Sequence, residues 1–239
     1  MKDVICIFAK NPKPGTIKKN LGKAIGKKAA AKLSKSFIID TIATTLRISN
    51  VDLALAVWPP DSIEEFNGLV SYLQNHELDF KITEKSKNIK LLPQIGKDLG
   101  ERMKNVSAEM FDSGVERLLI IGYDSPQIEQ SIYRAAFELL KSNDVVLGPT
   151  FDGGYYLIGM TKHNPELFEN ISWGKPVIYR ETVGKIDALN MSWQELELSY
   201  DVDDTDDLDQ LYFDIDNHRL TGDDIICVHT ERCLKELAE

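Results

Sequence analysis

Val4-Ile5-Cys6-Ile7-Phe8 is an unbroken apolar run, and the lysine-rich segment Ala9-Lys10-Asn11-Pro12-Lys13-Pro14-Gly15-Thr16-Ile17-Lys18-Lys19-Asn20 follows it directly. The run predicts a buried strand, and a helical pattern begins behind the segment. A basic loop punctuated by Pro and Gly between a strand and a helix is one way in which α/β proteins hold a phosphate chain. Lysines supply charge there, and N–H groups at the helix start supply oriented donors. An ordinary solvated connection, with its lysines in water, is the alternative interpretation.

Further apolar runs alternate with helical patterns along the rest of the chain. We expect strands at 4–8, 53–58, 117–122, 145–147, 155–160 and 196–202, and helices at about 23–48, 62–74, 99–113, 127–141, 177–188 and 206–213. The stretch between the predicted helices at 62–74 and 99–113 is expected to be rich in loops. Continuous apolar strands between helices indicate a largely parallel sheet that is covered on both faces. Because no repeat, low-complexity block or linker divides the chain, we expect residues 1–239 to form a single domain.

Composition is that of a globular protein with a full core. The 239 residues are 43% hydrophobic and 28% charged. The three cysteines, Cys6, Cys227 and Cys233, form no CxxC pattern, so neither a disulfide framework nor a zinc site is indicated. We recognise neither a signal peptide nor an apolar run long enough to span a bilayer, and therefore expect a cytoplasmic protein that does not bind membranes.

Charge is distributed unevenly along the chain. The net charge of −10 argues against general affinity for nucleic acid or for anionic membranes. Residues 1–36 nevertheless contain ten lysines and one acid, a net +9, whereas residues 201–224 contain ten aspartates and one arginine, a net −9. Such a polarity suits an anionic ligand held through a divalent cation. A basic arm for nucleic acid is the competing interpretation, and aromatic residues do not alternate with these lysines as that would require.

Three loops, after Phe8, Ile121 and Val202, follow predicted strands and are expected at the carboxyl edge of the sheet, where α/β proteins bind ligands. In Gly122-Tyr123-Asp124-Ser125-Pro126, Asp124 either faces a ligand or caps the next helix, with Pro126 in the first turn. A cap by Ser125 instead would leave Asp124 available for a ligand.

The acidic run Asp201-Val202-Asp203-Asp204-Thr205-Asp206-Asp207 also ends a predicted strand. Alternation along the strand places Asp201 and Asp203 on one face, with Val202 turned away. Mg²⁺ prefers one or two carboxylates together with waters and phosphate oxygens, so Asp124 and Asp203 are our predicted metal pair for Mg²⁺ or Mn²⁺. Favourable charge at a helix N-terminus is the alternative, and it explains Asp206 and Asp207 better than Asp203.

Two further segments carry candidate binding residues. In Gly148-Pro149-Thr150-Phe151-Asp152-Gly153-Gly154-Tyr155-Tyr156, paired glycines let the backbone approach a ligand, and this pattern favours ligand contact over a plain hairpin. Arg102 follows a Gly-flanked loop and either clamps a phosphate or carboxylate or forms an exposed ion pair. Neither a nucleophile elbow nor a Walker loop nor a dinucleotide fingerprint is present in the sequence.

Taken together, these segments resemble the glycosyltransferase-A-type transferases associated with radical-SAM and selenium-domain operons, relatives of the molybdenum-cofactor and lactate-phosphate guanylyltransferases. The matching residues are, in chain order, Phe8-Ala9-Lys10, Pro12, Pro14-Gly15, Lys18, Gln94, Gly96, Asp98-Leu99-Gly100-Glu101-Arg102-Met103, Gly122, Asp124, Pro126, Gly148-Pro149, Asp152-Gly153-Gly154-Tyr155, Trp173, Thr182 and Asp201-Val202-Asp203. The resemblance covers nearly the whole chain, and the shared order of the motifs is more specific than any one of them.

The resemblance implies a nucleotide-diphospho-sugar transferase fold, a single-domain three-layer α/β/α structure with a mixed, mostly parallel sheet. It implies a transferase whose partners are a nucleotide or nucleotide-sugar and a small-molecule acceptor, and it leaves the oligomeric state open. Lys18 and Asp152 are its expected catalytic residues, and Asp124 and Asp203 its ligands for Mg²⁺ or Mn²⁺. The expected nucleotide-binding residues are Lys10, Gly15, Lys18, Lys19, Arg102 and Asp124, and the expected acceptor-binding residues are Asp152, Gly153, Gly154 and Tyr155.

One departure from the family pattern bears on turnover. The family usually reads Lys-Thr-Arg-Leu where this chain has Lys18-Lys19-Asn20-Leu21. The neutral Asn20 cannot form a two-pronged cationic contact, and Lys19 restores the charge without that geometry. Because loss of one transition-state donor costs on the order of 10²–10³ in rate, two functions stay open. One is nucleotidyl or glycosyl transfer, and the other is a catalytically weakened nucleotide-binding relative with a regulatory or scaffold role.

Overall fold

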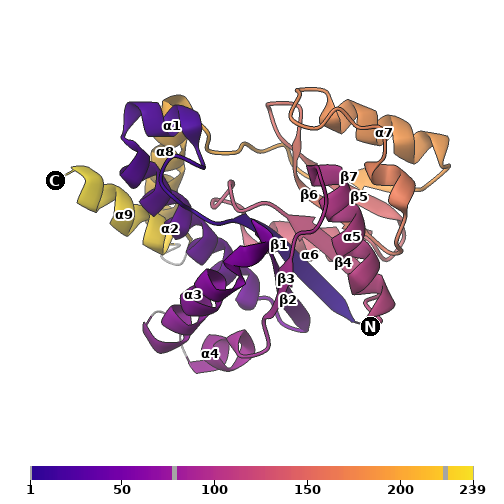
Figure 1. The fold of residues 1–239 in the computed structure, drawn as a ribbon, viewed down its shortest axis with the longest axis horizontal. Coiled ribbons are helices and arrows are strands. Elements are labelled where there is room, and N and C mark those ends of the chain that lie inside the picture. The colour runs from indigo at the N-terminus through magenta and orange to yellow at the C-terminus, as the bar shows by residue number, and fades with distance from the viewer. Residues whose placement is uncertain (1, 77–79, 223–225, 239) are drawn as a thin grey trace.

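The structure, a computed structural model, describes residues 2–76, 80–222 and 226–238. Its centre is a seven-stranded sheet with the strand order β3-β2-β1-β4-β6-β5-β7 (Figure 1). The strands are β1 (Asp3–Lys10), β2 (Val51–Trp58), β3 (Lys90–Pro93), β4 (Arg117–Ile121), β5 (Val145–Pro149), β6 (Tyr155–Met160) and β7 (Trp193–Glu195). Only β6 runs antiparallel to its neighbours in this sheet, because a short loop joins it to β5. The predicted mixed, mostly parallel sheet is therefore confirmed.

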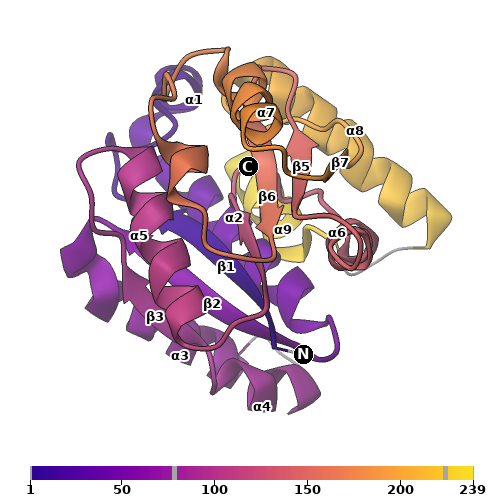
Figure 2. The ribbon, with the colours of Figure 1, turned by 90° about the vertical axis from the view of Figure 1, so that its right-hand side faces the viewer.

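Helices cover both faces of the sheet (Figures 1 and 2). They are α1 (Lys19–Ala24), α2 (Lys27–Leu46), α3 (Ile63–His76), α4 (Phe80–Ser86), α5 (Leu99–Asp112), α6 (Gln130–Leu139), α7 (Ile178–Ala188), α8 (Thr205–Thr221) and α9 (Val228–Ala238), with 3₁₀ turns η1 (Pro60–Ser62) and η2 (Pro165–Phe168). One core joins the sheet to α2, α3, α6, α8 and α9, and the other joins it to α5, α7 and η2.

The first strand shows why its apolar run is unbroken. Ile5 and Ile7 contribute to the core beside α2, whereas Val4 and Cys6 contribute to the core beside α5. A strand that buries both of its faces has no position for a polar side chain. The predicted three-layer α/β/α arrangement is thus present, and none of the described helices combines the length and apolar composition that a membrane crossing requires.

One predicted helix is divided in the structure, and one predicted strand is absent. The single helix expected over 23–48 is divided into α1 and α2 at Gly26, whose φ of +92° is incompatible with a continuing helix. The strand expected over 196–202 is wrong, since β7 ends at Glu195 and only Ser199 forms a further isolated bridge, to Thr150. The chain still follows β5 there, since Leu196 N donates to Leu147 O at 2.8 Å and Ser199 N donates to Pro149 O at 3.0 Å, but these bonds do not form a regular ladder.

Several elements went unpredicted. The stretch expected to be loop-rich contains α4 and the four-residue edge strand β3. The helix expected to end near residue 213 continues to Thr221, because Leu211 and Ile215 keep the buried stripe and Gly222 supplies the left-handed C-cap. The helix α9 follows it and packs against α2.

The buried Asp40 of α2 holds α9 in place. Its carboxylate accepts backbone N–H bonds from His229, at 3.0 Å, and from Thr230, at 2.8 Å. These are donors in the first turn of α9, which the rest of that helix cannot satisfy. The contact joins segments far apart in the sequence, so no local sequence pattern predicts it.

Candidate functional site

Three loops converge at the carboxyl edge of the sheet. The loop after β4 is joined to the segment at 199–203 by hydrogen bonds: Val202 N donates to Asp124 O at 2.8 Å, and Gln127 Nε2 donates to Tyr200 O at 2.8 Å. Val202 is fully buried in the core beside α2. The acids that flank it are therefore held next to Asp124, as the predicted alternation requires.

The predicted metal pair meets around a lysine. Lys18 Nζ lies 2.5 Å from Asp124 Oδ1 and 2.8 Å from Asp203 Oδ1. The Lys18 side chain is 3% exposed, whereas that of Asp203 is 63% exposed. Burial alone lowers the pKa of Lys18, but the charges of Asp124 and Asp203 outweigh it and the pKa is raised. The ammonium is accordingly charged at neutral pH and bridges both carboxylates.

Lys18 also has an unusual backbone. Lys18 directly precedes the short helix α1 and has φ 42° and ψ 55°. These angles lie in the left-handed region, which residues other than glycine rarely adopt. Such a conformation persists where surrounding contacts hold it, and it is often found at functional sites. The two ion pairs of the Lys18 side chain are contacts of this kind.

A cavity of about 350 Å³ opens beside this triad. Its lining residues are Lys10, Thr16, Ile17, Lys18, Lys19, Asn20, Tyr123, Asp124 and Asp203. Lys10 Nζ donates to Thr16 O at 2.8 Å, and Gly15 turns the loop with φ +82°. The predicted phosphate lysines and both predicted metal ligands thus share one cavity. Gly15 shapes the loop and is not part of the lining.

A second, smaller cavity of about 230 Å³ shares Asp124 as a wall. Its lining residues are Phe8, Leu99, Met103, Ile120, Ile121, Gly122, Asp124, Tyr155, Tyr156, Ile158 and Asp201. Asp124 therefore faces a basic cavity on one side and an apolar, tyrosine-lined cavity on the other.

Asp201 is a site residue that sequence reasoning placed beside Asp203 but gave no role. Ser125 Oγ donates to Asp201 Oδ1 at 2.5 Å. Burial, followed by the charge of Asp124, raises the pKa of Asp201 to about 7. Its position two residues before Asp203 on an alternating segment was the signal that pointed to it, whereas its burial is visible only in the structure.

The loop between β5 and β6 is held rigidly beside the second cavity. Asp152 Oδ1 accepts from Thr150 Oγ1 at 2.5 Å and from Gly154 N at 3.0 Å. Tyr179 N donates to Gly153 O at 2.9 Å, and a Cβ atom at Gly153 would lie 2.5 Å from Pro176 O. One oxygen of Asp152 is therefore committed to the loop itself, which a reading of the sequence alone does not reveal.

Tyr155, the first residue of β6, follows this loop. It is half-buried with a buried hydroxyl oxygen, and burial raises the pKa of the phenol. Tyr155 lines the second cavity together with Asp124 and Asp201. Of the four predicted acceptor residues, Tyr155 alone appears in the lining of that cavity, while Gly153 and Gly154 shape the turn that leads to it.

Arg102 is not brought to either cavity, although it lies in the described part of the chain. Its guanidinium stacks over the Trp58 ring at 4.3 Å from the centroid, and its Nε has no hydrogen-bond partner among the described residues. Partial burial lowers the pKa of Arg102. The structure thus separates this residue from the lysines with which it was grouped.

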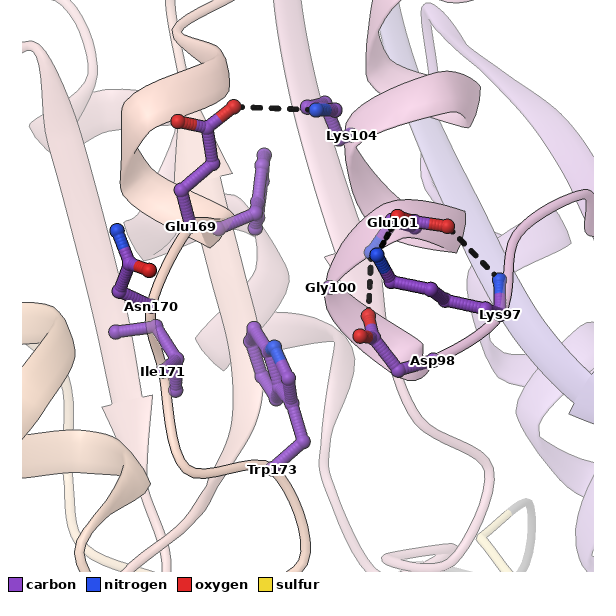
Figure 3. Close-up of a pocket in the computed structure, with 10 residues that line it drawn as sticks. Lys97, Asp98, Gly100, Glu101, Lys104, Glu169, Asn170, Ile171 and Trp173 are labelled. Carbon is purple, nitrogen blue, oxygen red and sulfur yellow. Dashed lines mark hydrogen bonds and ion pairs between the residues drawn. The ribbon is translucent and has the colours of Figure 1, made fainter.

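A third cavity of about 420 Å³ lies between the start of α5 and the segment at 168–173 (Figure 3). Ion pairs cross or border it: Lys104 contacts Glu169 at 3.1 Å, and Lys97 contacts Glu101 at 2.7 Å. The Trp173 ring occupies the space above Gly100, where a Cβ atom would lie 2.2 Å from Trp173 Nε1. The predicted catalytic and metal-binding residues are absent from its lining.

The carboxylates of Asp124 and Asp203 fit a divalent cation that is also held by a ligand. Within the described ranges, the chain brings together no group of three or more His, Cys, Asp or Glu side chains able to hold a metal ion. Two hard carboxylate oxygens nevertheless lie within 2.8 Å of one nitrogen atom. Mg²⁺ commonly binds through one or two carboxylates and takes its other ligands from phosphates and water. The donor set therefore suits Mg²⁺ or Mn²⁺ brought in with a phosphate chain.

Comparisons with known proteins agree with this fold. A family model described as "Uncharacterized protein conserved in bacteria (DUF2064)" matches residues 44–175. The crystal structure of a protein from Desulfovibrio desulfuricans G20, described as a "putative nucleotide-diphospho-sugar transferase", is 32% identical with a TM-score of 0.75, over 89% of this chain and 87% of that one. Among the curated proteins, none matches this chain.

More distant structures share the fold alone. The 4-diphosphocytidyl-2C-methyl-D-erythritol synthase of Anaerococcus prevotii DSM 20548 is 11% identical with a TM-score of 0.55, over 89% of this chain and 98% of that one. The Rv0371c homolog from Mycobacterium sp. strain JC1 is 18% identical with a TM-score of 0.50, over 90% and 97% of the two chains.

Proposed function

This chain belongs to the DUF2064 family of uncharacterized proteins conserved in bacteria, and we propose that it is a transferase that takes the transferred group from a nucleotide. The observation that carries the proposal is the convergence of Asp124 and Asp203 on Lys18 Nζ at the wall of a lysine-lined cavity. The 32% identity to a protein described as a "putative nucleotide-diphospho-sugar transferase" supports it.

In this proposal the phosphate chain of the donor lies in the lysine-lined cavity. Lys10, Lys18 and Lys19 neutralise its charge, and Asp124 with Asp203 holds Mg²⁺ or Mn²⁺. The cation, when bound, offsets negative charge on the phosphate oxygens and on the leaving group. Charge stabilisation of this kind is the main contribution that proteins make to transfer from phosphates.

The acceptor approaches from the β5–β6 loop, across Asp124 from the phosphates. Tyr155 lines the second cavity, and Gly153 and Gly154 let the loop come close to a ligand. Since Asp152 Oδ1 is engaged by Thr150 and Gly154, the oxygen assigned to orient the attacking group of the acceptor is Oδ2. We assign Asp152 this role as the expected acid–base group of the site.

A nucleotide-binding protein without turnover is the second candidate. Two observations favour it. Asn20 stands where the family that the sequence resembles has an arginine, and Lys18 already forms ion pairs with both carboxylates.

We further propose that residues 1–239 act as one domain in the cytoplasm, and that the chain belongs to the radical-SAM- and selenium-domain-associated group.

Calorimetric titration with each nucleoside triphosphate and a panel of nucleotide sugars, in the presence of Mg²⁺, tests the proposal. We expect one class of donor to bind, and we expect Asp124→Asn to weaken that binding while Asp206→Asn, an exposed acid in the first turn of α8, leaves it unchanged. Binding of none of these donors would overturn the nucleotide assignment. Binding with no release of pyrophosphate or nucleoside diphosphate across a panel of acceptors would favour the second candidate.

A further inference from the structure

The space between the two carboxylates is already filled by a cation that belongs to the chain. We propose that the Lys18 ammonium occupies the metal position of the nucleotide-free protein, and that a divalent ion enters only when the phosphate chain of a nucleotide draws Lys18 away. The exchange rests on the function proposed above, because it takes Asp124 and Asp203 to be the metal ligands of a nucleotide-dependent transferase.

The geometry makes the two cations mutually exclusive. Lys18 Nζ contacts Oδ1 of both acids, at 2.5 and 2.8 Å, so an ion bound by the same two oxygens would overlap or directly adjoin the ammonium. The lysine is also the buried member of the triad, at 3% exposure. A metal ion arriving from solvent therefore meets two carboxylates that already share one buried positive charge.

The surroundings oppose metal entry in the absence of a nucleotide. A displaced Lys18 would move into a cavity that Lys10 and Lys19 also line, where like charges repel it. Phosphate groups in that cavity reverse the balance, because they attract the freed ammonium and supply the remaining oxygen ligands of the metal. One lysine thus serves the carboxylates in the free state and the phosphates in the bound state.

The backbone at Lys18 is suited to such a movement. Its left-handed conformation, with φ 42°, is one that a lysine adopts only under constraint. Gly15 with φ +82° and Gly26 with φ +92° flank the loop and the short helix α1. Release of the side chain from the carboxylates removes the contacts that hold the strained residue, and the glycines on either side let the segment adjust.

Titration of Mn²⁺ into the protein of residues 1–239 without nucleotide, monitored through the electron paramagnetic resonance signal of free Mn²⁺, tests the exchange. We expect weak binding by the wild type and at least tenfold tighter binding by Lys18→Gln. Lys23→Gln removes the same charge from an exposed position of α1 that is not part of the cavity lining, and we expect it to bind Mn²⁺ as the wild type does. Adding Asp124→Asn to Lys18→Gln should abolish the gain.

Two further measurements keep the test decisive if Lys18→Gln unfolds. Lys18→Met is a second neutral side chain of similar length and should show the same gain. In the wild type, acetic anhydride should label the Lys18 amine more slowly than the exposed Lys19 amine, as read by mass spectrometry. Equal Mn²⁺ affinity in the wild type and a folded Lys18 variant, or equal labelling of the two amines, would overturn the proposal.

These outcomes are separate from those of the donor titration. No nucleotide is added, so a protein that binds no nucleotide can still show the tighter Mn²⁺ binding of Lys18→Gln. Conversely, if the protein binds nucleotides but Lys18→Gln shows no gain in Mn²⁺ affinity, the exchange proposal is overturned and the proposed donor site still stands.

Discussion

Asp124 follows β4 and Asp203 precedes α8, yet Oδ1 of each lies within 2.8 Å of the same nitrogen atom, Lys18 Nζ. Neither contact depends on proximity in the sequence. The loop after β4 and the segment before α8 are joined through Val202 N and Asp124 O, and the loop after β1 delivers the lysine. The carboxyl edge of the parallel part of the sheet is what brings these three segments together.

Removal of one carboxylate tests the metal assignment. Asp203→Asn should weaken the binding of a nucleotide in the presence of Mg²⁺ by about tenfold or more, since a lost contact to a charged group costs at least about 1.5 kcal/mol. Because Asp203 is 63% exposed, its replacement should leave the fold intact. Calorimetric titration with the nucleotide, once with Mg²⁺ and once with EDTA, measures the change. If the wild type and Asp203→Asn bind the nucleotide equally under both conditions, Asp203 does not belong to the metal site.

An arginine at position 20, as in the family that the sequence resembles, tests whether Asn20 limits the rate of turnover. Asn20 lines the lysine-lined cavity, so an arginine placed there can reach bound phosphates. Asn20→Arg should raise the rate of donor turnover, by up to the order of 10²–10³ attributed to one transition-state donor. Asn20→Gln, which lengthens the side chain without charge, is the matched control. If Asn20→Arg and Asn20→Gln turn over equally, the missing arginine does not limit the rate.

Parts of the site followed from the sequence because they depend on strand ends. Lys10 is the last residue of one apolar strand and Asp124 follows another, and parallel strands place their carboxyl ends at one edge. The alternation at Asp201, Val202 and Asp203 likewise sets which side chains share a face. These are local rules, and they were sufficient to group the lysines with both acids.

Other parts depend on tertiary contacts that no local pattern contains. The insertion of Lys18 between the carboxylates, the burial that shifts the pKa of Asp201, and the stacking of Arg102 on Trp58 all arise between segments distant in sequence. The position of α9 is of the same kind, since its first turn is held by Asp40 of α2.

The turn between β5 and β6 allows backbone strain to be separated from steric contact. Gly153 has φ +84°, and a Cβ atom there would lie 2.5 Å from Pro176 O. Gly174 has a similar φ of +79° but nothing within 4 Å of its Cβ position. Gly174→Ala should therefore cost only the penalty of the left-handed backbone, roughly 1–2 kcal/mol. Gly153→Ala should cost about 1–3 kcal/mol more, which is typical of overpacking.

Urea unfolding of the two glycine variants measures these costs. Since the clash moves the loop that carries Asp152, Gly153→Ala should also weaken binding of the acceptor once one is known, whereas Gly174→Ala should not. Equal losses of stability in the two variants would mean that the loop shifts freely away from Pro176.

Glu231 contributes to the attachment of α9 to α8 in a way that should weaken at acid pH. Its carboxylate accepts from Lys235 Nζ at 2.5 Å and from Arg219 Nη2 at 2.7 Å. Lys235, and then Arg219, lower the pKa of Glu231 below its ordinary value of 4.5. A carboxyl with a lowered pKa in the folded state adds stability above its unfolded pKa, and this stability is lost as the pH falls through the folded pKa.

Glu231→Gln should consequently be less stable than the wild type near neutral pH, by about 1 kcal/mol after allowance for partial exposure. The gap should begin to close as the pH falls below about 4.5, the ordinary value from which the pKa of Glu231 is lowered, because only the wild type then takes up the proton. Urea unfolding at a series of pH values measures the gap, with Glu64→Gln at an exposed position of α3 as the control. A gap that is constant across this pH range would show that the contribution of Glu231 is packing alone, with no contribution from its charge.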